Sequence, residues 1–275
     1  DEGFFFCLFD TPDRVAHMFW RFAESEHPAN RGRIEAEMAR VIDDHYRACD
    51  AVVGNAMEFV DEQTLLIVLS DHGMNSFQRG VHLNTWLYDN GLLALRNGVA
   101  PGEEAGDFFR NVDWSRTRAY AVGLGSLYLN LKGREEQGIV DGADAEALKA
   151  DIIKGLSGLI DERSGKVAIR SVVAREQVYS GPYAAESPDL LVNFSEGYRV
   201  SWDTALGGVP EGHFEDNVKK WGGDHIIDPC LVPGALFMNR GFKGEKASLL
   251  DMAPTILEAL GVPRGESMEG ESLLI

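Results

Sequence analysis

The first seventy residues alternate between apolar runs and amphipathic stretches. Residues 4–9 are almost entirely apolar and predict a buried strand, and residues 14–23 carry apolar side chains at helical spacing. A longer amphipathic stretch covers residues 34–60, with Ile34 among its core-facing positions, and leads into the β-favouring run of residues 64–70. Strand, helix and strand in this order predict an α/β fold with a mostly parallel sheet flanked by helices.

The pattern changes in the middle of the chain, where Gly and Pro interrupt shorter apolar segments. Short strands are expected at residues 118–122, 127–131 and 189–194, and a helix at residues 143–159. We interpret this region as an α+β insert, or cap, over one edge of the main sheet.

The last part of the chain again contains a β-favouring run followed by an amphipathic helical stretch. A strand is expected at residues 235–238, and a helix at residues 248–260 that Gly261 closes. The resulting division places the second half of an α/β core in residues 1–96, the insert in residues 97–212, and a core segment that completes a metal site in residues 213–275.

Composition narrows the class of partner. A hydrophobic fraction of 44% is typical of a globular domain, and no apolar run approaches the roughly 20 residues that a membrane-spanning helix needs. The formal net charge of -18 argues against nucleic-acid binding, which depends on Lys and Arg neutralising phosphates. An anionic small-molecule substrate would therefore be met by metal ions or local Arg side chains.

The cysteines and the chain start carry less information. Cys7, Cys49 and Cys230 are scattered, without the spacing of a zinc ribbon or a disulfide framework, and are expected to be buried structural residues. The chain opens on an apolar run without an initiator Met or a signal-peptide layout. We therefore expect the domain to begin before Asp1, and the compartment stays open.

Candidate chemistry begins at the first predicted helix. Asp13 and His17 are four residues apart, so on a helix both side chains project from one face and can hold one ion. Taken alone the pair is weak evidence, because a capping Asp beside an unrelated His is common.

Asp71-His72-Gly73 follows the most apolar predicted strand. Ligands in open α/β sheets collect beyond the carboxyl ends of the strands, which places this carboxylate and imidazole for chemistry, although a polar turn has the same composition.

His225 lies in the glycine-containing loop Trp221-Gly222-Gly223-Asp224-His225. Two Asp/His pairs and a loop His together supply carboxylate and imidazole ligands suited to Zn²⁺ or Mn²⁺. Three imidazoles argue against a calcium-only site, because calcium prefers oxygen ligands.

The chain resembles the alkaline phosphatase superfamily, in its type I phosphodiesterase/nucleotide pyrophosphatase branch, and is similar to the C-terminal part of predicted phosphohydrolase/phosphomutase proteins. The resemblance is carried by five local motifs: Thr11-Pro12-Asp13-Arg14-Val15-Ala16-His17-Met18-Phe19-Trp20, Leu69-Ser70-Asp71-His72-Gly73-Met74, Leu83-Asn84-Thr85-Trp86-Leu87, Gly223-Asp224-His225, and Asp251-Met252-Ala253-Pro254-Thr255-Ile256-Leu257.

The resemblance implies hydrolysis of phosphate mono- or diesters with two divalent metals. Asp13, His17 and His225 would hold one metal, and Asp71 with His72 would hold the second. The family adds one more Asp ligand and a Thr or Ser nucleophile from the part of the domain that precedes Asp1. The residues printed here would then have little activity by themselves.

Other polar residues are less informative. Arg79 is a candidate substrate-phosphate ligand, although a solvated loop Arg is the simpler interpretation. His27 and His45 are expected at the surface, and His82 and His213, at the borders of the insert, receive no role.

Three alternatives stay open. A phosphomutase or phosphotransferase would share the metal ligands and differ in the cap. A sulfatase would need a Cys or Ser precursor of formylglycine before Asp1, and a non-catalytic metal-binding fragment would bind ions without turnover. Oligomeric state is not predicted.

Overall fold

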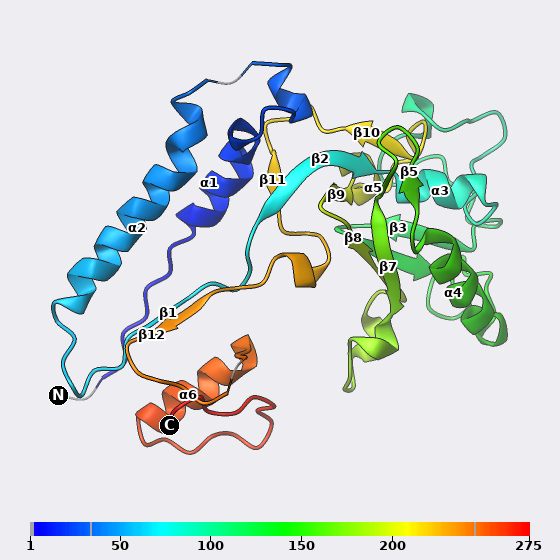
Figure 1. Cartoon of the computed structure of the whole chain (residues 1–275). Helices are drawn as coiled ribbons and strands as arrows, with labels where there is room; N and C mark the ends of the chain where they lie inside the picture. Colours follow the sequence, from blue (N-terminus) through cyan, green and yellow to red (C-terminus); the bar gives the residue numbers. More distant parts are fainter. Residues whose placement is uncertain (1–2, 34, 245) are drawn as a thin grey trace.

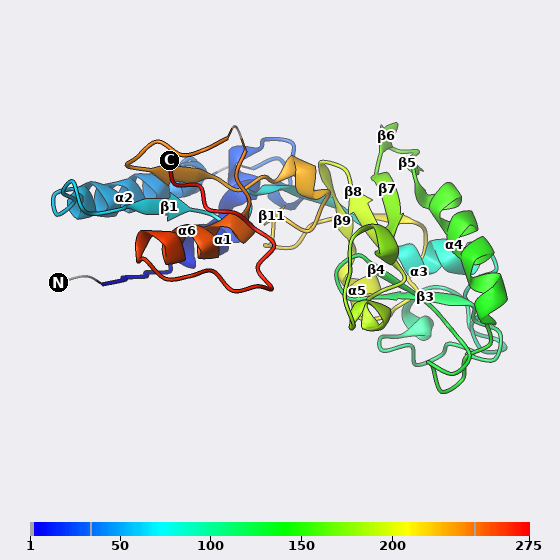
Figure 2. The same ribbon diagram turned by 90° about the horizontal axis from the view of Figure 1, so that it is seen from below.

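The computed structural model describes residues 3–33, 35–244 and 246–275, so Ile34 lies outside the described residues. The described chain forms two lobes along one long axis, and the strand β2 (Asn75–Val81) runs from one to the other (Figures 1 and 2). The α-helices are α1 (Thr11–Phe19), α2 (Val41–Met57), α3 (Leu83–Asp89), α4 (Gly142–Leu156), α5 (Trp202–Ala205) and α6 (Met252–Ala259). The remaining strands are β1 (Ile67–Leu69), β3 (Ala119–Val122), β4 (Ser126–Leu129), β5 (Ile160–Asp161), β6 (Lys166–Val167), β7 (Ile169–Ala174), β8 (Leu190–Phe194), β9 (Gly197–Val200), β10 (Phe214–Asp216), β11 (Gly223–Asp224) and β12 (Leu236–Met238).

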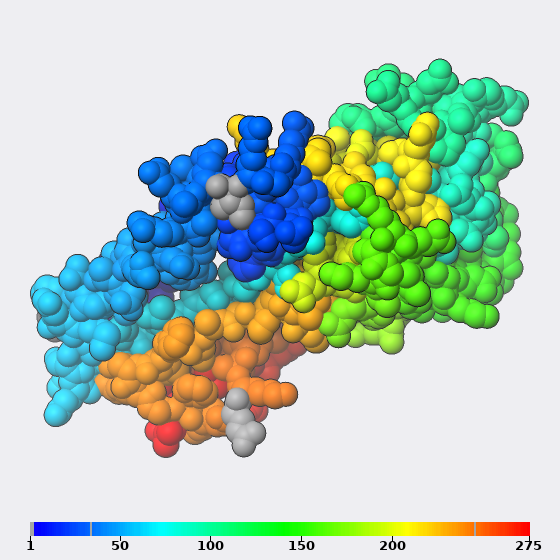
Figure 3. All heavy atoms as spheres, turned by 45° about the horizontal axis from the view of Figure 1, so that its top comes forward, coloured from blue at the N-terminus to red at the C-terminus, as the bar shows by residue number. Residues whose placement is uncertain are grey.

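The first lobe contains α1, α2, α6 and the pair β1–β12, and the second contains α3, α4, α5 and β3 to β8 (Figure 1). In Figure 3 the blue and orange surfaces of the first lobe lie on one half of the molecule, and the green surface of the second lobe lies on the other. Both ends of the described chain belong to the first lobe. Residues distant in sequence therefore meet near the junction of the two lobes, where β11 pairs with β2.

The mixed α/β class is confirmed, but the expected mostly parallel sheet is not formed by the described residues. β1 pairs antiparallel with β12, and the order β3-β4-β8-β7 is antiparallel throughout. β2 pairs antiparallel with β10 and β11 and parallel with β9. The predicted βαβ unit needed residues 4–9 to pair as a strand, and they form no regular element.

The hydrophobic core of the described chain lies in the second lobe and is built from residues 81–232. The predicted elements of the insert are confirmed there with small changes of boundary, as β3, β4, β8 and α4. Val81 and Leu83 enter this core from before residue 97, and Ile227 and Val232 enter it from after residue 212. The core therefore joins the insert to both flanking segments.

The first lobe exposes many of the apolar side chains that the sequence places in a core. Phe5 and Phe6, in the predicted buried strand, are 87% and 72% exposed, and α2 contains no buried residue. The helix expected over residues 34–60 is shorter than predicted, and its Phe59 is exposed. An amphipathic pattern marks the apolar side of an element, and burial requires a neighbouring surface as well.

Local elements elsewhere follow their patterns. α1 covers the first predicted helix and continues as a 3₁₀ turn, and β12 matches the strand at residues 235–238. The last helix forms as a 3₁₀ turn followed by α6, and Gly261 adopts a positive φ just beyond it. No helix within the described ranges has the length and apolar character to cross a bilayer.

The cysteine prediction is wrong. Cys7 and Cys230 are exposed and Cys49 is half-buried. Cys7 belongs to the unpaired N-terminal segment, and Cys230 lies in a short surface turn that Asp228 caps. Neither position has a layer of side chains above it that would bury a thiol.

Two phenylalanines test the contrast between the lobes. Phe194 on β8 is fully buried, whereas Phe237 on β12 is 67% exposed. We expect Phe194→Ala to lower the free energy of unfolding by about 3–5 kcal/mol, as for other buried aromatics. Phe237→Ala should change it by less than about 0.5 kcal/mol. Urea denaturation of both variants, made in residues 1–275, measures the difference, and equal losses would show that β12 is covered in solution.

Candidate metal centre

Helix α1 presents Asp13 and His17 on one face, as their spacing predicts. The His17 side chain is buried, and its Nε2 lies 3.3 Å from Asp13 Oδ1. Its Nδ1 lies 2.6 Å from the carbonyl oxygen of Gly223, which can only accept, so Nδ1 carries the proton. The Nε2 lone pair therefore faces the carboxylate, which is the tautomer that a metal ligand needs.

Close approach of β11 to α1 makes this hydrogen bond possible. A Cβ at Gly223 would lie 2.7 Å from Trp20 Cβ and 2.9 Å from the carbonyl oxygen of Ala16, so only glycine fits. The glycine loop noted in the sequence thus sets the distance between the helix and the strand that leads to His225.

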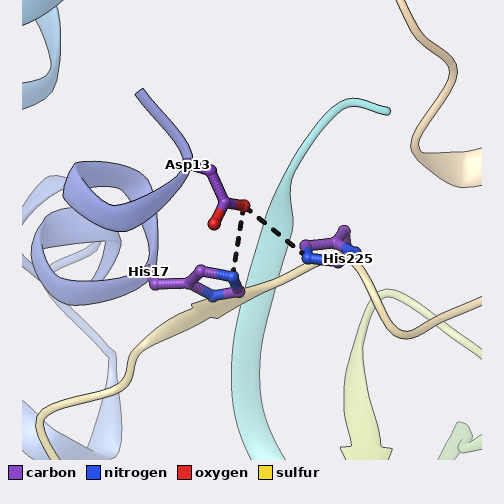
Figure 4. A group of neighbouring side chains, drawn as sticks. All are labelled: Asp13, His17 and His225. Atoms are coloured by element: carbon purple, nitrogen blue, oxygen red, sulfur yellow. Dashed lines mark ion pairs between the residues drawn. The ribbon is translucent and has the colours of Figure 1, made fainter. Parts of the chain in front are cut away.

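Two further imidazoles face the same carboxylate oxygen. Nε2 of His225 lies 3.6 Å from Asp13 Oδ1, and Nε2 of His72 lies 4.0 Å from it. The rings of His72 and His225 stack with centroids 3.6 Å apart. Figure 4 shows Asp13 between His17, from the same helix, and His225, from the loop after β11.

His72 has the same tautomer as His17. Its Nδ1 lies 2.8 Å from the carbonyl oxygen of Gly73. This oxygen accepts a hydrogen bond from Nδ1–H, and Nε2 therefore keeps its lone pair. A carboxylate oxygen and several imidazole lone pairs directed toward one point repel each other unless a cation or a proton lies among them.

One carboxylate oxygen of Asp13 receives no hydrogen bond from the described residues. Its Oδ1 is buried and has no hydrogen-bond partner among the described residues. A buried, unpartnered carboxylate oxygen is unfavourable by itself and suits a ligand position. The ligand atoms of Asp13, His17 and His225 lie within 4.8 Å of one another, so small movements would bring them to one ion.

Asp71 lies on the open side of this cluster. Its side chain is 73% exposed, and Oδ2 lies 3.7 Å from His72 Nε2. Its Oδ1 accepts a hydrogen bond from the backbone N–H of His72. Asp71 and His72 thus form an incomplete, solvent-facing pair beside the more enclosed Asp13, His17 and His225.

The electrostatic surroundings keep His225 neutral. Burial lowers the pKa of His225 below its ordinary value, and the neighbouring His72 and His17 lower it further, whereas Asp224 and Asp13 act in the opposite direction. A lowered pKa means that the imidazole is unprotonated near neutral pH, which leaves its lone pair available to a cation.

A buried ion pair holds the His225 loop. Asp224 Oδ1 accepts hydrogen bonds from the backbone N–H groups of His225 and Ile226, and Oδ2 lies 2.7 Å from Nε of the fully buried Arg199. The Arg199 guanidinium also lies over the ring of Trp202, 4.1 Å from its centroid. Arg199 belongs to β9, whose Tyr198 and Val200 are part of the core of the second lobe, so this pair connects that lobe to the loop that carries His225.

Sequence reasoning missed several supporting residues. His27, expected at the surface, is buried, and its Nε2 contacts the carbonyl oxygens of Phe77 and Gly222. Trp221 stacks on His17 and donates a hydrogen bond to Asp224. The sequence offered one signal for the supporting role of Trp221 and Asp224, which is their position beside His225. Nothing in the sequence around Arg199 distinguishes it from other arginines.

Arg79 lies elsewhere. Its guanidinium pairs with Asp161 and Asp216, and its side chain is largely buried. Although burial opposes the charge, these carboxylates raise the pKa of Arg79. The solvated loop position expected for Arg79 is wrong, because the residue lies on β2 with a largely buried side chain. With its donors directed at two carboxylates, Arg79 has the geometry of a structural residue, which argues against a role in phosphate binding.

The Arg199–Asp224 pair leads to a stability prediction. Asp224→Ala leaves a buried guanidinium uncompensated and should lower the free energy of unfolding by about 3–5 kcal/mol. Adding Arg199→Met should recover part of that loss, since no buried charge then remains. Asp71→Ala, at an exposed carboxylate, serves as the control and should change stability by less than about 0.5 kcal/mol. Denaturant titration of the metal-free proteins measures these changes. Equal stability of the Asp224→Ala and Asp71→Ala variants would contradict this account.

One known family matches most of the chain. The type I phosphodiesterase / nucleotide pyrophosphatase family matches residues 1–216. The match contains Asp13, His17, Asp71 and His72, and His225 lies beyond it. A search of curated proteins finds no match to the chain. Because the match covers most of the chain, the protein belongs to the type I phosphodiesterase / nucleotide pyrophosphatase family of the alkaline phosphatase superfamily.

Proposed function

We propose that this protein hydrolyses phosphate esters with two divalent transition metals, Zn²⁺ or alternatively Mn²⁺. The observation that carries the proposal is the convergence of three imidazole Nε2 atoms on Asp13 Oδ1, at 3.3, 3.6 and 4.0 Å. Nitrogen and carboxylate donors in one cluster suit Zn²⁺ and Mn²⁺. Asp13, His17 and His225 would hold one cation, and Asp71 with His72 would supply two of the ligands that hold the other.

The charge of the chain makes such cations useful. A formal net charge of -18 repels a phosphate ester, so productive binding needs local positive charge. Two bound divalent cations would offset the negative charge on the transferring phosphoryl group and on the attacking and leaving oxygens. Asp13 and Asp71 offset part of the cations' charge, and the fixed tautomers of His17 and His72 keep their ligand atoms directed toward the cluster.

The exposed position of Asp71 fits the substrate side of this centre. His17 is enclosed by α1, β11 and the Trp221 ring, whereas Asp71 faces solvent. A substrate phosphate would approach from that open side, between Asp71 and the stacked rings of His72 and His225. Arg79 is left out of this substrate site because its guanidinium is paired with Asp161 and Asp216.

By the family pattern, the attacking hydroxyl of a Thr or Ser and one further Asp ligand belong to sequence that precedes Asp1. We include this in the proposal, together with a larger, mostly parallel sheet to which that sequence contributes. Its support is the apolar surface of the first lobe, where Phe5, Phe6, Phe9 and Phe237 are at least half exposed. A surface of this kind usually packs against another part of a protein.

The test is metal-dependent hydrolysis of bis(p-nitrophenyl) phosphate and p-nitrophenyl phosphate, with the sequence preceding Asp1 included. Treatment with EDTA should abolish turnover, and added Zn²⁺ or Mn²⁺ should restore it. His225→Ala and Asp71→Ala should each lower kcat/KM by at least about 100-fold, since loss of even a supporting contact to a metal ligand costs 10–100-fold. His45→Ala, on the surface of α2, is the matched control and should retain activity.

The outcomes separate the alternatives. Unchanged hydrolysis after complete metal removal would contradict the proposal. Metal binding without turnover, with and without the preceding sequence, would identify a non-catalytic metal-binding protein. Transfer of the phosphoryl group to an added alcohol or sugar phosphate, in place of water, would favour the phosphotransferase or phosphomutase alternative, and release of sulfate from an aryl sulfate would favour a sulfatase.

A further inference from the structure

A second group of ligand-type side chains lies at the opposite end of β2 from the Asp13 cluster. His82, Asp203 and Glu215 each offer one ligand atom, and these atoms lie within 4.8 Å of one another. Asn75, at the start of β2, pairs with Asp224 beside the first cluster, whereas His82 directly follows Val81 at the other end. Seven steps of about 3.3 Å along a strand separate Asn75 from His82 by up to roughly 23 Å.

His82 is buried and its tautomer is fixed. Its side chain is 3% exposed, and Nδ1 lies 2.9 Å from the carbonyl oxygen of Gly212, to which it donates. In the neutral ring the lone pair is then on Nε2, and this atom is buried without a hydrogen-bond partner among the described residues. Unpartnered buried nitrogen is uncommon in proteins and indicates that a partner is missing.

Glu215 faces this nitrogen. Its Oε1 lies 3.7 Å from His82 Nε2, too far for a hydrogen bond and close to the separation of two ligands on one metal ion. Glu215 is opposite Gly80 in the β10–β2 register, and a Cβ at Gly80 would lie 3.0 Å from Glu215 Oε1. The glycine thus leaves the space in which the carboxylate reaches toward His82.

Asp203 reaches the site from α5, the helix that follows the neighbouring strand β9. β2 and β9 are parallel, with Val81 opposite Val200, so His82 and the α5 residue Asp203 both follow the carboxyl end of a strand. This end of parallel strands is where ligands commonly bind in α/β folds. The end of β2, α5 and β10 therefore each bring one ligand-type side chain to this place.

The surroundings attract cations. Asp203 also borders a cavity of about 730 Å³, whose lining includes Glu103, Glu104, Asp107 and Glu211. The negative potential of these carboxylates raises the local concentration of divalent cations beside Asp203.

We propose that His82, Asp203 and Glu215 form an additional metal site, distinct from the two-metal centre of the proposed function, which binds one divalent transition metal such as Zn²⁺ or Mn²⁺. One imidazole nitrogen and two carboxylates match the preferences of these ions, and two negative charges balance one dication. The site is separate from the Asp13 cluster and does not depend on the proposed hydrolysis. Its expected role is to connect β2, α5 and β10, and so to stabilise the second lobe.

The experiment counts Co²⁺ ions, as a spectroscopic substitute for Zn²⁺, bound to the metal-free whole chain. Visible absorption during titration and elemental analysis after dialysis give the stoichiometry. His82→Asn keeps a donor for the Gly212 carbonyl while it removes the Nε2 ligand, and Glu215→Gln keeps the shape while it removes the charge. Each should lose one equivalent of Co²⁺, whereas Glu211→Gln, in the same cavity outside the three ligands, should lose none.

A background variant separates this site from the first one. Asp13→Ala/His72→Ala/His225→Ala removes the first cluster and should still bind one Co²⁺, which Zn²⁺ displaces. Added Zn²⁺ should raise the Tm of this variant, and addition of Glu215→Gln should remove the increase. If the background variant binds no Co²⁺, or if His82→Asn and Glu215→Gln leave binding unchanged, the three residues form only an ion pair. Should His82→Asn fail to fold, the more exposed Glu215 gives the same test.

Discussion

The ion pair between Arg199 and Asp224 holds the two lobes and the candidate metal centre in one arrangement. Arg199 is the largest fully buried side chain, and burial lowers its pKa although Asp224 opposes that shift. A buried guanidinium is tolerated only with a carboxylate beside it, which fixes where Asp224 lies. Since Asp224 also binds the backbone N–H groups of His225 and Ile226, the same constraint sets the direction of the His225 loop.

Backbone carbonyl groups fix the tautomers of the histidines in the candidate metal centre. Backbone carbonyls of Gly223 and Gly73 accept hydrogen bonds from the Nδ1–H groups of His17 and His72, so that each ring keeps an Nε2 lone pair directed toward Asp13. His82 repeats this pattern with the carbonyl of Gly212 at the far end of β2. In all three cases the backbone selects the tautomer before any ligand binds, which lowers the reorganisation needed on binding.

The sequence predicted the local parts of this arrangement well. The i, i+4 spacing of Asp13 and His17 and the glycine loop before His225 describe short-range geometry, and α1 and β11 have that geometry. The apolar patterns of the insert likewise predicted β3, β4, β8 and α4. What the sequence did not predict depends on contacts between distant segments: the partner of Arg199, the burial of His27 and the antiparallel pairing of β1 with β12.

The overestimated burial of residues 4–9 and α2 has the same origin. Hydrophobic periodicity identifies the side of an element that tends to be buried, but the neighbour that buries it is not encoded in the pattern. The glycines show the reverse case. Gly223 and Gly80 carry no periodic signal, yet the space that each leaves decides whether His17 or Glu215 can reach its position.

The central claim is that Asp13 and the surrounding imidazoles form a transition-metal site. Crystals of the Zn²⁺-loaded protein, measured on both sides of the zinc absorption edge, test it most directly. The account predicts an anomalous difference peak about 2.0–2.2 Å from Asp13 Oδ1, His17 Nε2 and His225 Nε2. Absence of a peak there in fully loaded protein, with these side chains still converging as in Figure 4, would contradict it.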